Sequence, residues 1–214
     1  MAHTPHPSQV LVSDSQISEP LAVVDNRVFV LVLQHPQEGR EPRATAATAV
    51  GVLRHARLVA GLSWPNLARA LGRRAEPRRW AVLHLGSARP AAFGRESEIL
   101  LLGRGGEPVA DPRPILAGLE GIVLLDGSWS EAKTLWWRNP WLLKLHRLVL
   151  NPPHPALLGK LRREPRREAL STLEAAALAL RHLEAGPDAA DALLAALDRL
   201  MAAVARPGQT AVKP

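Results

Sequence analysis

The sequence predicts a single α/β domain with a mostly parallel sheet and C-terminal helices, on three observations. Its strand-like segments are apolar runs without polar alternation, which is typical of strands buried on both faces. Helical patterns separate these runs, as the crossovers between parallel strands require. The chain has 214 residues, of which 47% are hydrophobic, and this is enough for one sizeable core.

The N-terminal half begins with a polar segment that prolines interrupt. We therefore expect residues 1–24 to form a disordered tail, and a single domain to run from 25 to 206. A first strand is predicted over Val28–Leu33, before Pro36. Small and apolar residues at helical spacing predict a helix over 44–58, and a second strand follows at about 80–85.

The C-terminal half opens with an apolar run, EILLLG, and a loop rich in Gly and Pro. Two strands are then predicted at 121–125 and 146–150, and three helices at 128–139, 171–186 and 188–205. Two of these helices begin with a capping-box pattern, Ser128 with Glu131 and Ser171 with Glu174. We expect residues 207–214 to be a flexible tail.

Composition excludes several classes of protein. The chain has no Cys, so disulfides, thiolate metal sites and Cys nucleophiles are excluded, and a site built from His alone would need several of eight to converge. We therefore expect no metal. No apolar run approaches the roughly eighteen residues of a membrane span, and the N-terminal residues do not resemble a signal peptide. These features predict a cytoplasmic protein.

Charge points to nucleic acid as the first partner to consider. The formal net charge is +7, the pI is about 11.1, and all but four of the 27 basic residues are Arg. Arg makes planar, bidentate contacts to phosphate. A chain rich in Ala, Arg, Leu and Pro also arises from a GC-rich genome, so composition alone leaves both explanations open.

Four of the six Trp lie within residues 124–142, LLDGSWSEAKTLWWRNPWL. On a helix, two adjacent faces would carry Trp129, Ala132 and Trp136, and Lys133, Trp137 and Trp141. Such stripes are most often core. A ligand site is the alternative, because ligands of open α/β sheets bind beyond the carboxyl ends of strands, where Asp126 to Trp129 are expected. There an acid can accept a proton and an indole can stack.

The segment Asp126 to Trp129, DGSW, resembles the Asp-x-Thr-Trp signature of the DTW-domain family. Three further segments are similar to family motifs in the same order. LVLQHPQEGREPRATAATA contains His35 and Glu38 and resembles a His-Pro-x-Glu segment followed by a Thr-bearing helix start; WAVLHLGSA resembles a Leu-Tyr-Pro-Ser/Gly segment; LRREPRREALSTLEAAA resembles an Arg-rich segment before Ser/Cys-Thr-x-Glu-Ala. Together they span residues 28–180.

The resemblance implies a tRNA-uridine aminocarboxypropyltransferase, which moves the 3-amino-3-carboxypropyl group of S-adenosylmethionine to N3 of a uridine and releases methylthioadenosine. It also implies a SPOUT-like fold with a knotted cofactor site. Two alternatives stay open: the same transfer onto ribosomal RNA or another acceptor, and an RNA-binding module without catalysis. A Rossmann-type methyltransferase and a Ser hydrolase are disfavoured, because neither Gly-x-Gly-x-x-Gly nor Gly-x-Ser-x-Gly occurs.

The resemblance also assigns residues. Asp126 becomes the candidate base or orienter for N3, and Ser128 keeps the hydroxyl of the usual Thr. The implied cofactor-binding residues are Thr45, Thr48, Leu85, Gly86, Ser87, Leu125, Trp129, Ala132, Ser171, Thr172 and Glu174. The implied RNA-binding residues are Arg138, Lys144, Arg147, Lys160, Arg162, Arg163, Arg166 and Arg167. Helix capping remains a comparable explanation for Ser128, Ser171 and Glu174, and a solvated loop for the basic run.

The chain departs from the family pattern in two respects. Many relatives carry N-terminal Cys clusters with zinc-ligand spacing, and this chain has no Cys. Ala44 stands where relatives often have Gly, and His84 and Leu85 replace Tyr-Pro. The first departure puts the docking of the substrate in question, and the second puts local loop geometry in question.

Overall fold

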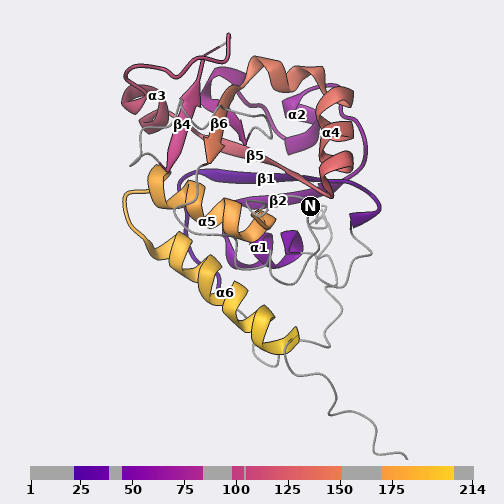
Figure 1. The fold of residues 1–214 in the computed structure, drawn as a ribbon, viewed down its shortest axis with the longest axis vertical. Helices are drawn as coiled ribbons and strands as arrows, with labels where there is room; N and C mark the ends of the chain where they lie inside the picture. The colour runs from indigo at the N-terminus through magenta and orange to yellow at the C-terminus, as the bar shows by residue number, and fades with distance from the viewer. Residues whose placement is uncertain (1–21, 39–44, 84–97, 104, 151–169, 205–214) are drawn as a thin grey trace, which may run out of the picture.

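The computed structural model describes residues 22–38, 45–83, 98–103, 105–150 and 170–204. Within these ranges, six strands form one sheet in the order β2-β1-β5-β3-β6-β4 (Figure 1). The strands are β1 (Phe29–Gln34), β2 (Ala56–Ala60), β3 (Trp80–Leu83), β4 (Ile99–Leu102), β5 (Gly121–Asp126) and β6 (His146–Leu150). Every neighbouring pair is parallel except β4 and β6, which are antiparallel. The predicted mostly parallel α/β sheet is confirmed.

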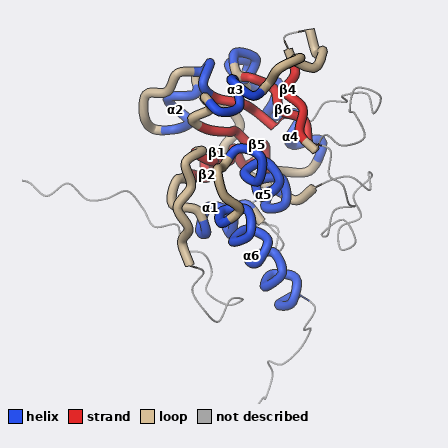
Figure 2. Tube along the Cα trace, turned by 90° about the vertical axis from the view of Figure 1, so that its left-hand side faces the viewer, coloured by secondary structure: helices blue, strands red, loops and turns tan. Residues whose placement is uncertain are grey.

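Helices cover both faces of this sheet. They are α1 (Ala46–Val52), α2 (Leu67–Leu71), α3 (Arg113–Ala117), α4 (Trp129–Arg138), α5 (Thr172–Leu183) and α6 (Asp188–Val204), with 3-10 turns η2 (Pro77–Arg79) and η4 (Pro140–Lys144). Figures 1 and 2 show α1, α5 and α6 together on one side of the central strands, and Figure 1 shows α2 and α4 on the other. The predicted C-terminal helices are thus confirmed as α5 and α6.

The core consists of one apolar cluster on each face of the sheet. Val32 and Leu124 belong to the cluster that packs against α1, α5 and α6. Leu31, Leu33 and Val123 belong to the cluster that packs against α2, α4 and η4. Because successive side chains of a strand point to opposite faces, both parities must be apolar here. This is why the central strands read as unbroken apolar runs.

The helix predicted over 44–58 is wrong in its second half. Helix α1 ends at Val52, and residues 56–60 form β2, which pairs in parallel with β1 along all five residues. Five residues are too few to distinguish the alternation of a strand from the spacing of a continuing helix. The pairing with β1 is what makes this segment a strand. The five-residue helices α2 and α3 were not predicted for the same reason of length.

The ends of the chain fall largely outside the described ranges, and so do most of the predicted tails at 1–24 and 207–214. Of the N-terminal segment, residues 22–24 are described, and the Val24 amide donates to the Val52 carbonyl at 2.8 Å. None of the helices in the described ranges has the length and apolar character that crossing a membrane requires.

Candidate functional site at the carboxyl edge of the sheet

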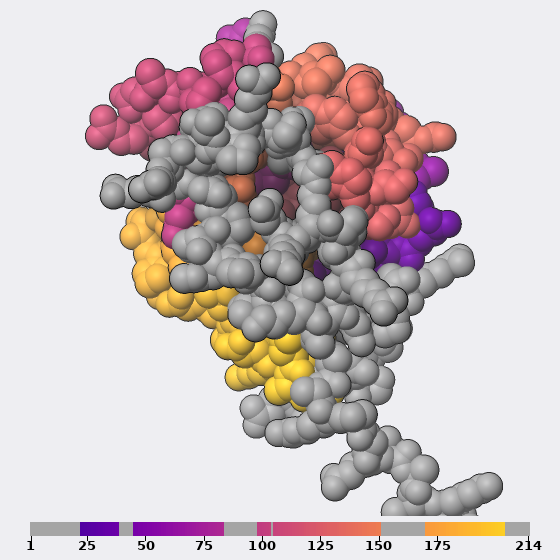
Figure 3. All heavy atoms as spheres, viewed as in Figure 1, coloured from indigo at the N-terminus to yellow at the C-terminus, as the bar shows by residue number. Residues whose placement is uncertain are grey.

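The central strands β1 and β5 end side by side. Gln34 is the register partner of Asp126, and the His35 amide donates to the Asp126 carbonyl at 2.9 Å. By strand alternation, the Gln34 and Asp126 side chains point to the face that α1 and α5 cover. Figure 3 shows the two chain segments, indigo and orange-red, adjacent at the right-hand edge of the molecule.

Asp126 is the buried centre of this edge, with 4% of its surface exposed. Its Oδ2 accepts a hydrogen bond from Gln34 Nε2 at 2.9 Å, and its Oδ1 accepts one from the Thr172 hydroxyl at the start of α5. These contacts join three segments that lie far apart in the chain. Both of these donors are neutral groups that fix the carboxylate in position. The result is a carboxylate of defined orientation at a strand end.

Gly127 allows the chain to turn sharply from β5 into α4. Its φ is +152°, and a Cβ added there would lie 2.8 Å from Glu131 Cβ. An L side chain would therefore be strained by backbone conformation and by contact. The glycine brings Ser128, the N-cap of α4, directly after the buried acid.

Ser128 and Glu131 form the capping box that their spacing predicts. The Ser128 hydroxyl accepts from the Glu131 amide at 3.4 Å, and Glu131 Oε2 accepts from the Ser128 amide at 2.7 Å. Glu131 Oε1 also pairs with His35 Nδ1 at 3.2 Å, which ties the start of α4 to the end of β1. Burial alone would raise the pKa of the Glu131 carboxyl, but the hydrogen bonds from Ser128 and the neighbouring His35 outweigh it and lower that pKa.

Glu131→Gln is expected to destabilise the protein by about 1 kcal/mol at neutral pH, because the charged partner of the cap and of His35 is lost. A carboxyl with a lowered folded-state pKa stabilises the fold above its ordinary value of 4.5, and this stabilisation is lost as the pH falls through the folded-state value. The difference between variant and wild type should therefore shrink in acid, which urea unfolding across pH measures. Asp198→Asn, at an exposed position on α6, is the control. A difference independent of pH would contradict the assignment.

The start of α5 combines a cap with a contact to the acid. The Ser171 hydroxyl accepts from the Glu174 amide at 3.2 Å, and Glu174 Oε2 accepts from the Ser171 amide at 2.9 Å. Capping is thus confirmed for both residues. Thr172, between them in sequence, is the residue of this segment that hydrogen-bonds Asp126.

The start of α1 supplies Thr45 and Thr48 on the same face of the sheet. Thr45 is the N-cap residue and is 5% exposed, and its side chain makes no capping hydrogen bond. Thr48 is half-buried. Because α1 follows β1, its first turn lies toward the edge where β1 and β5 end.

The tryptophan-rich helix divides between core and surface. Trp141 and Ala132 are 6% and 2% exposed, so core packing is confirmed for these two. Trp129 and Trp137 are 39% and 75% exposed, and core packing is wrong for them. Trp129 follows the turn at Asp126 and Gly127 and begins α4, and more than a third of its surface is accessible.

Several predicted residues take no part in this arrangement or lie outside the described ranges. Leu125 packs with the apolar cluster on the opposite face from Asp126. Arg138 and Lys144 are exposed, whereas Arg147 is half-buried and donates to the Gly103 carbonyl. The predicted residues outside the described ranges are Leu85, Gly86, Ser87, Lys160, Arg162, Arg163, Arg166 and Arg167.

The sequence did not single out Gln34, although it holds Asp126. Gln34 is 6% exposed and ends an otherwise apolar run, FVLVLQ. A polar residue that closes a buried strand is the signal that could have found it. Glu38, which the resemblance did single out as the acid of the His-Pro-x-Glu segment, is also buried, at 5% exposure.

This geometry defines an α/β protein whose candidate site lies beyond the carboxyl ends of its central strands, where open sheets of this class bind ligands. Residues 9–205 match the DTW domain, the domain of tRNA-uridine aminocarboxypropyltransferases. The chain therefore belongs to the DTW-domain family. No curated protein and no solved structure matches it.

Proposed function

We propose that this protein transfers the 3-amino-3-carboxypropyl group of S-adenosylmethionine to N3 of a uridine in tRNA, and that it does so in the cytoplasm. The observation that carries the proposal is Asp126. The acid of the family signature is buried at a strand end and is held by Gln34 and Thr172 from two other segments. A carboxylate fixed by contacts from two other segments is suited to orienting a reacting group.

The residues at this edge fit a sulfonium ligand that carries an amino acid. The Asp126 carboxylate complements a positive sulfur. Helices α4 and α5 both begin here, and helix N-termini favour a bound carboxylate. We propose that Thr45 and Thr48, at the start of α1, hold the amino-acid carboxylate of the same ligand. When bound, S-adenosylmethionine supplies an electrophilic methylene carbon next to the sulfur, together with a methyl group that must be kept from reacting.

Trp129 is our candidate for the shield of that methyl group. Trp129 is 39% exposed and lies three residues after Asp126 in the chain, and a flat aromatic wall attracts a cationic centre through its π face. Ala132, one turn along α4, is buried, and we propose that it lies behind the indole on the same side of the cofactor.

Asp126 has a second role at the acceptor. Its two oxygens accept hydrogen bonds from Gln34 and Thr172, and a carboxylate oxygen can accept more than one hydrogen bond. We propose that Asp126 accepts the hydrogen bond of uridine N3–H and directs the nitrogen lone pair at the methylene carbon. As the N3–carbon bond forms, the carbon–sulfur bond breaks, and the N3 proton leaves toward Asp126 and then solvent.

We propose that the exposed Arg138 and Lys144 and the basic segment at 160–167 bind the phosphate backbone of the tRNA. Binding of this kind falls steeply as salt rises. We also propose the finer fold of the family, a SPOUT-like arrangement with a knotted cofactor site. The segments 84–97 and 151–169, which follow β3 and β6, lie outside the described residues, and a structure with bound cofactor tests that arrangement.

The proposed reaction is tested with S-adenosylmethionine labelled separately in its aminocarboxypropyl and methyl groups. Purified protein and unmodified tRNA should give aminocarboxypropyl label in the RNA together with methylthioadenosine. Methyl label in the RNA would refute the chemistry. Label that enters ribosomal RNA but not tRNA, located by nucleoside analysis, would favour the alternative acceptor.

A further inference from the structure

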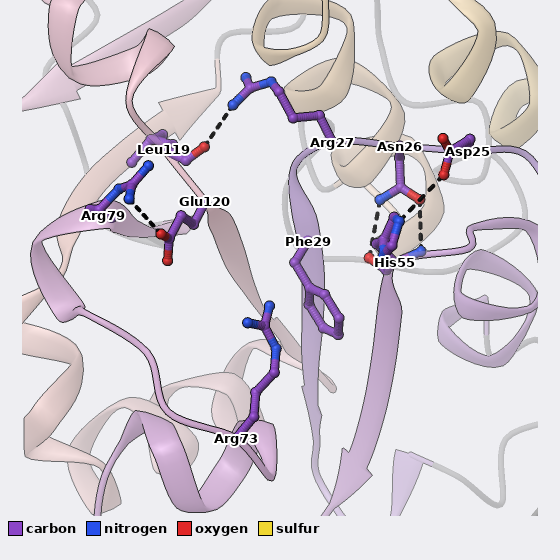
Figure 4. A pocket seen from close by; sticks show the side chains of 9 residues that line it. All are labelled: Asp25, Asn26, Arg27, Phe29, His55, Arg73, Arg79, Leu119 and Glu120. Atoms are coloured by element: carbon purple, nitrogen blue, oxygen red, sulfur yellow. Dashed lines mark hydrogen bonds and ion pairs between the residues drawn. The ribbon is translucent and has the colours of Figure 1, made fainter.

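A pocket of about 450 Å³ opens at the amino edge of the sheet, at the other end of the strands from Asp126. Its lining residues come just before or at the start of several strands: Phe29 begins β1, His55 precedes β2, Arg79 precedes β3 and Glu120 precedes β5. Figure 4 shows Arg79 and Glu120 paired on one side of Phe29, and His55 with Asn26 and Asp25 on the other. The pocket is therefore separate from the candidate site at the carboxyl edge.

Both acids of this pocket already have cationic partners. Glu120 Oε1 pairs with Arg79 Nη1 at 2.7 Å. Asp25 Oδ1 pairs with His55 Nε2 at 3.3 Å and with Arg54 Nε at 3.4 Å. Each carboxylate of the pocket therefore already has a basic side chain within 3.5 Å.

Two further guanidinium groups line the pocket without a carboxylate partner among the described residues. Arg27 donates to neutral carbonyls, those of Leu119 at 2.8 Å and Leu183 at 2.5 Å. The Arg73 guanidinium lies over the Phe29 ring, 5.1 Å from its centroid. Carbonyls and aromatic rings orient a cation but leave its charge in place. Figure 4 shows Arg73 rising into the opening from one side and Arg27 reaching across the other.

We propose that this pocket binds a phosphate group. Guanidinium groups match the oxygens of phosphate in planar, bidentate geometry. The apolar ring of Phe29 forms one wall, and its contact with the Arg73 guanidinium orders that side chain before a ligand binds. Less side-chain conformational entropy is then lost on binding. The volume lies within the range of ligand sites, about 300–1,000 Å³. An RNA phosphodiester and a free nucleotide carry the same chemistry, and the proposal stands independently of the transfer reaction.

The test is a calorimetric titration of the protein with inorganic phosphate at constant ionic strength. Arg73→Gln should weaken phosphate binding by about fivefold or more. This Arg is exposed, so the variant should remain folded, and circular dichroism verifies it. Arg74→Gln is the matched control, because Arg74 is the next residue, is exposed and does not line the pocket. It should bind phosphate as the wild type does.

Competition experiments with tRNA and with uridine monophosphate distinguish an RNA phosphodiester from a free nucleotide as the ligand. If unmodified tRNA displaces phosphate and Arg73→Gln binds tRNA more weakly, the ligand is the RNA backbone. If uridine monophosphate binds more tightly than phosphate and tRNA does not displace it, the ligand is a free nucleotide. Equal losses in Arg73→Gln and Arg74→Gln, or no saturable phosphate binding by the wild type, would overturn the proposal whether or not the protein transfers aminocarboxypropyl groups.

Discussion

Asp126→Asn is expected to lower aminocarboxypropyl transfer by about tenfold or more while leaving the protein folded. The substitution removes the negative charge and replaces one acceptor oxygen by an amide group that only donates. That amide would face either Gln34 Nε2 or the Thr172 hydroxyl, where the carboxylate now accepts hydrogen bonds. Orientation and charge are thus lost together. The formation of methylthioadenosine under single-turnover conditions measures the effect.

The control for this variant is Asp111→Asn, the same chemical change at an exposed loop position, which should leave the rate unchanged. Thermal unfolding of both variants separates a catalytic defect from a folding defect. A full rate in Asp126→Asn would remove Asp126 from the reaction. If the chain were a non-catalytic RNA-binding module, the wild type itself would form no methylthioadenosine, and RNA binding would be the same in both variants.

Most strands of the fold could be predicted, because a strand that is buried on both faces appears in the sequence as an unbroken apolar run. Residues 121–125 and 146–150 were placed to within a residue of β5 and β6. The strand β2 could not be predicted in the same way, because it is an edge strand whose existence depends on pairing with β1. Local pattern therefore decides the strongly apolar strands, the edge strand β4 among them, whereas tertiary contact decides β2, which is only partly buried.

In the candidate site, too, local contacts could be predicted from the sequence and long-range contacts could not. The capping boxes at Ser128 and Ser171 were predictable, since donor and acceptor lie three residues apart. The contacts of Asp126 with Gln34 and Thr172 were not, since they join positions 92 and 46 residues away. The resemblance to the family pointed to Asp126 and Thr172 separately. The register of β1 against β5 and the docking of α5 bring them together.

Trp129→Ala is expected to weaken the binding of S-adenosylmethionine by about tenfold while changing the stability of the fold little. The indole is 39% exposed, so its removal deletes less buried surface than a core substitution does. If it stands against the sulfonium methyl group as proposed, its removal costs the contact between the ring and the cation. Calorimetric titration with S-adenosylmethionine measures the first quantity, and urea unfolding measures the second.

Two tryptophans of the same segment provide matched controls for this variant. Trp137→Ala, at a position 75% exposed and two turns along α4 from Trp129, should change neither cofactor affinity nor stability. Trp141→Ala, at a position 6% exposed, should lose about 3 kcal/mol of stability, because it opens a cavity in the cluster beneath η4. A Trp129→Ala variant that lost stability as Trp141→Ala does, yet bound the cofactor normally when folded, would show that Trp129 is a packing residue. In that outcome, the shield for the methyl group would have to come from another part of the chain.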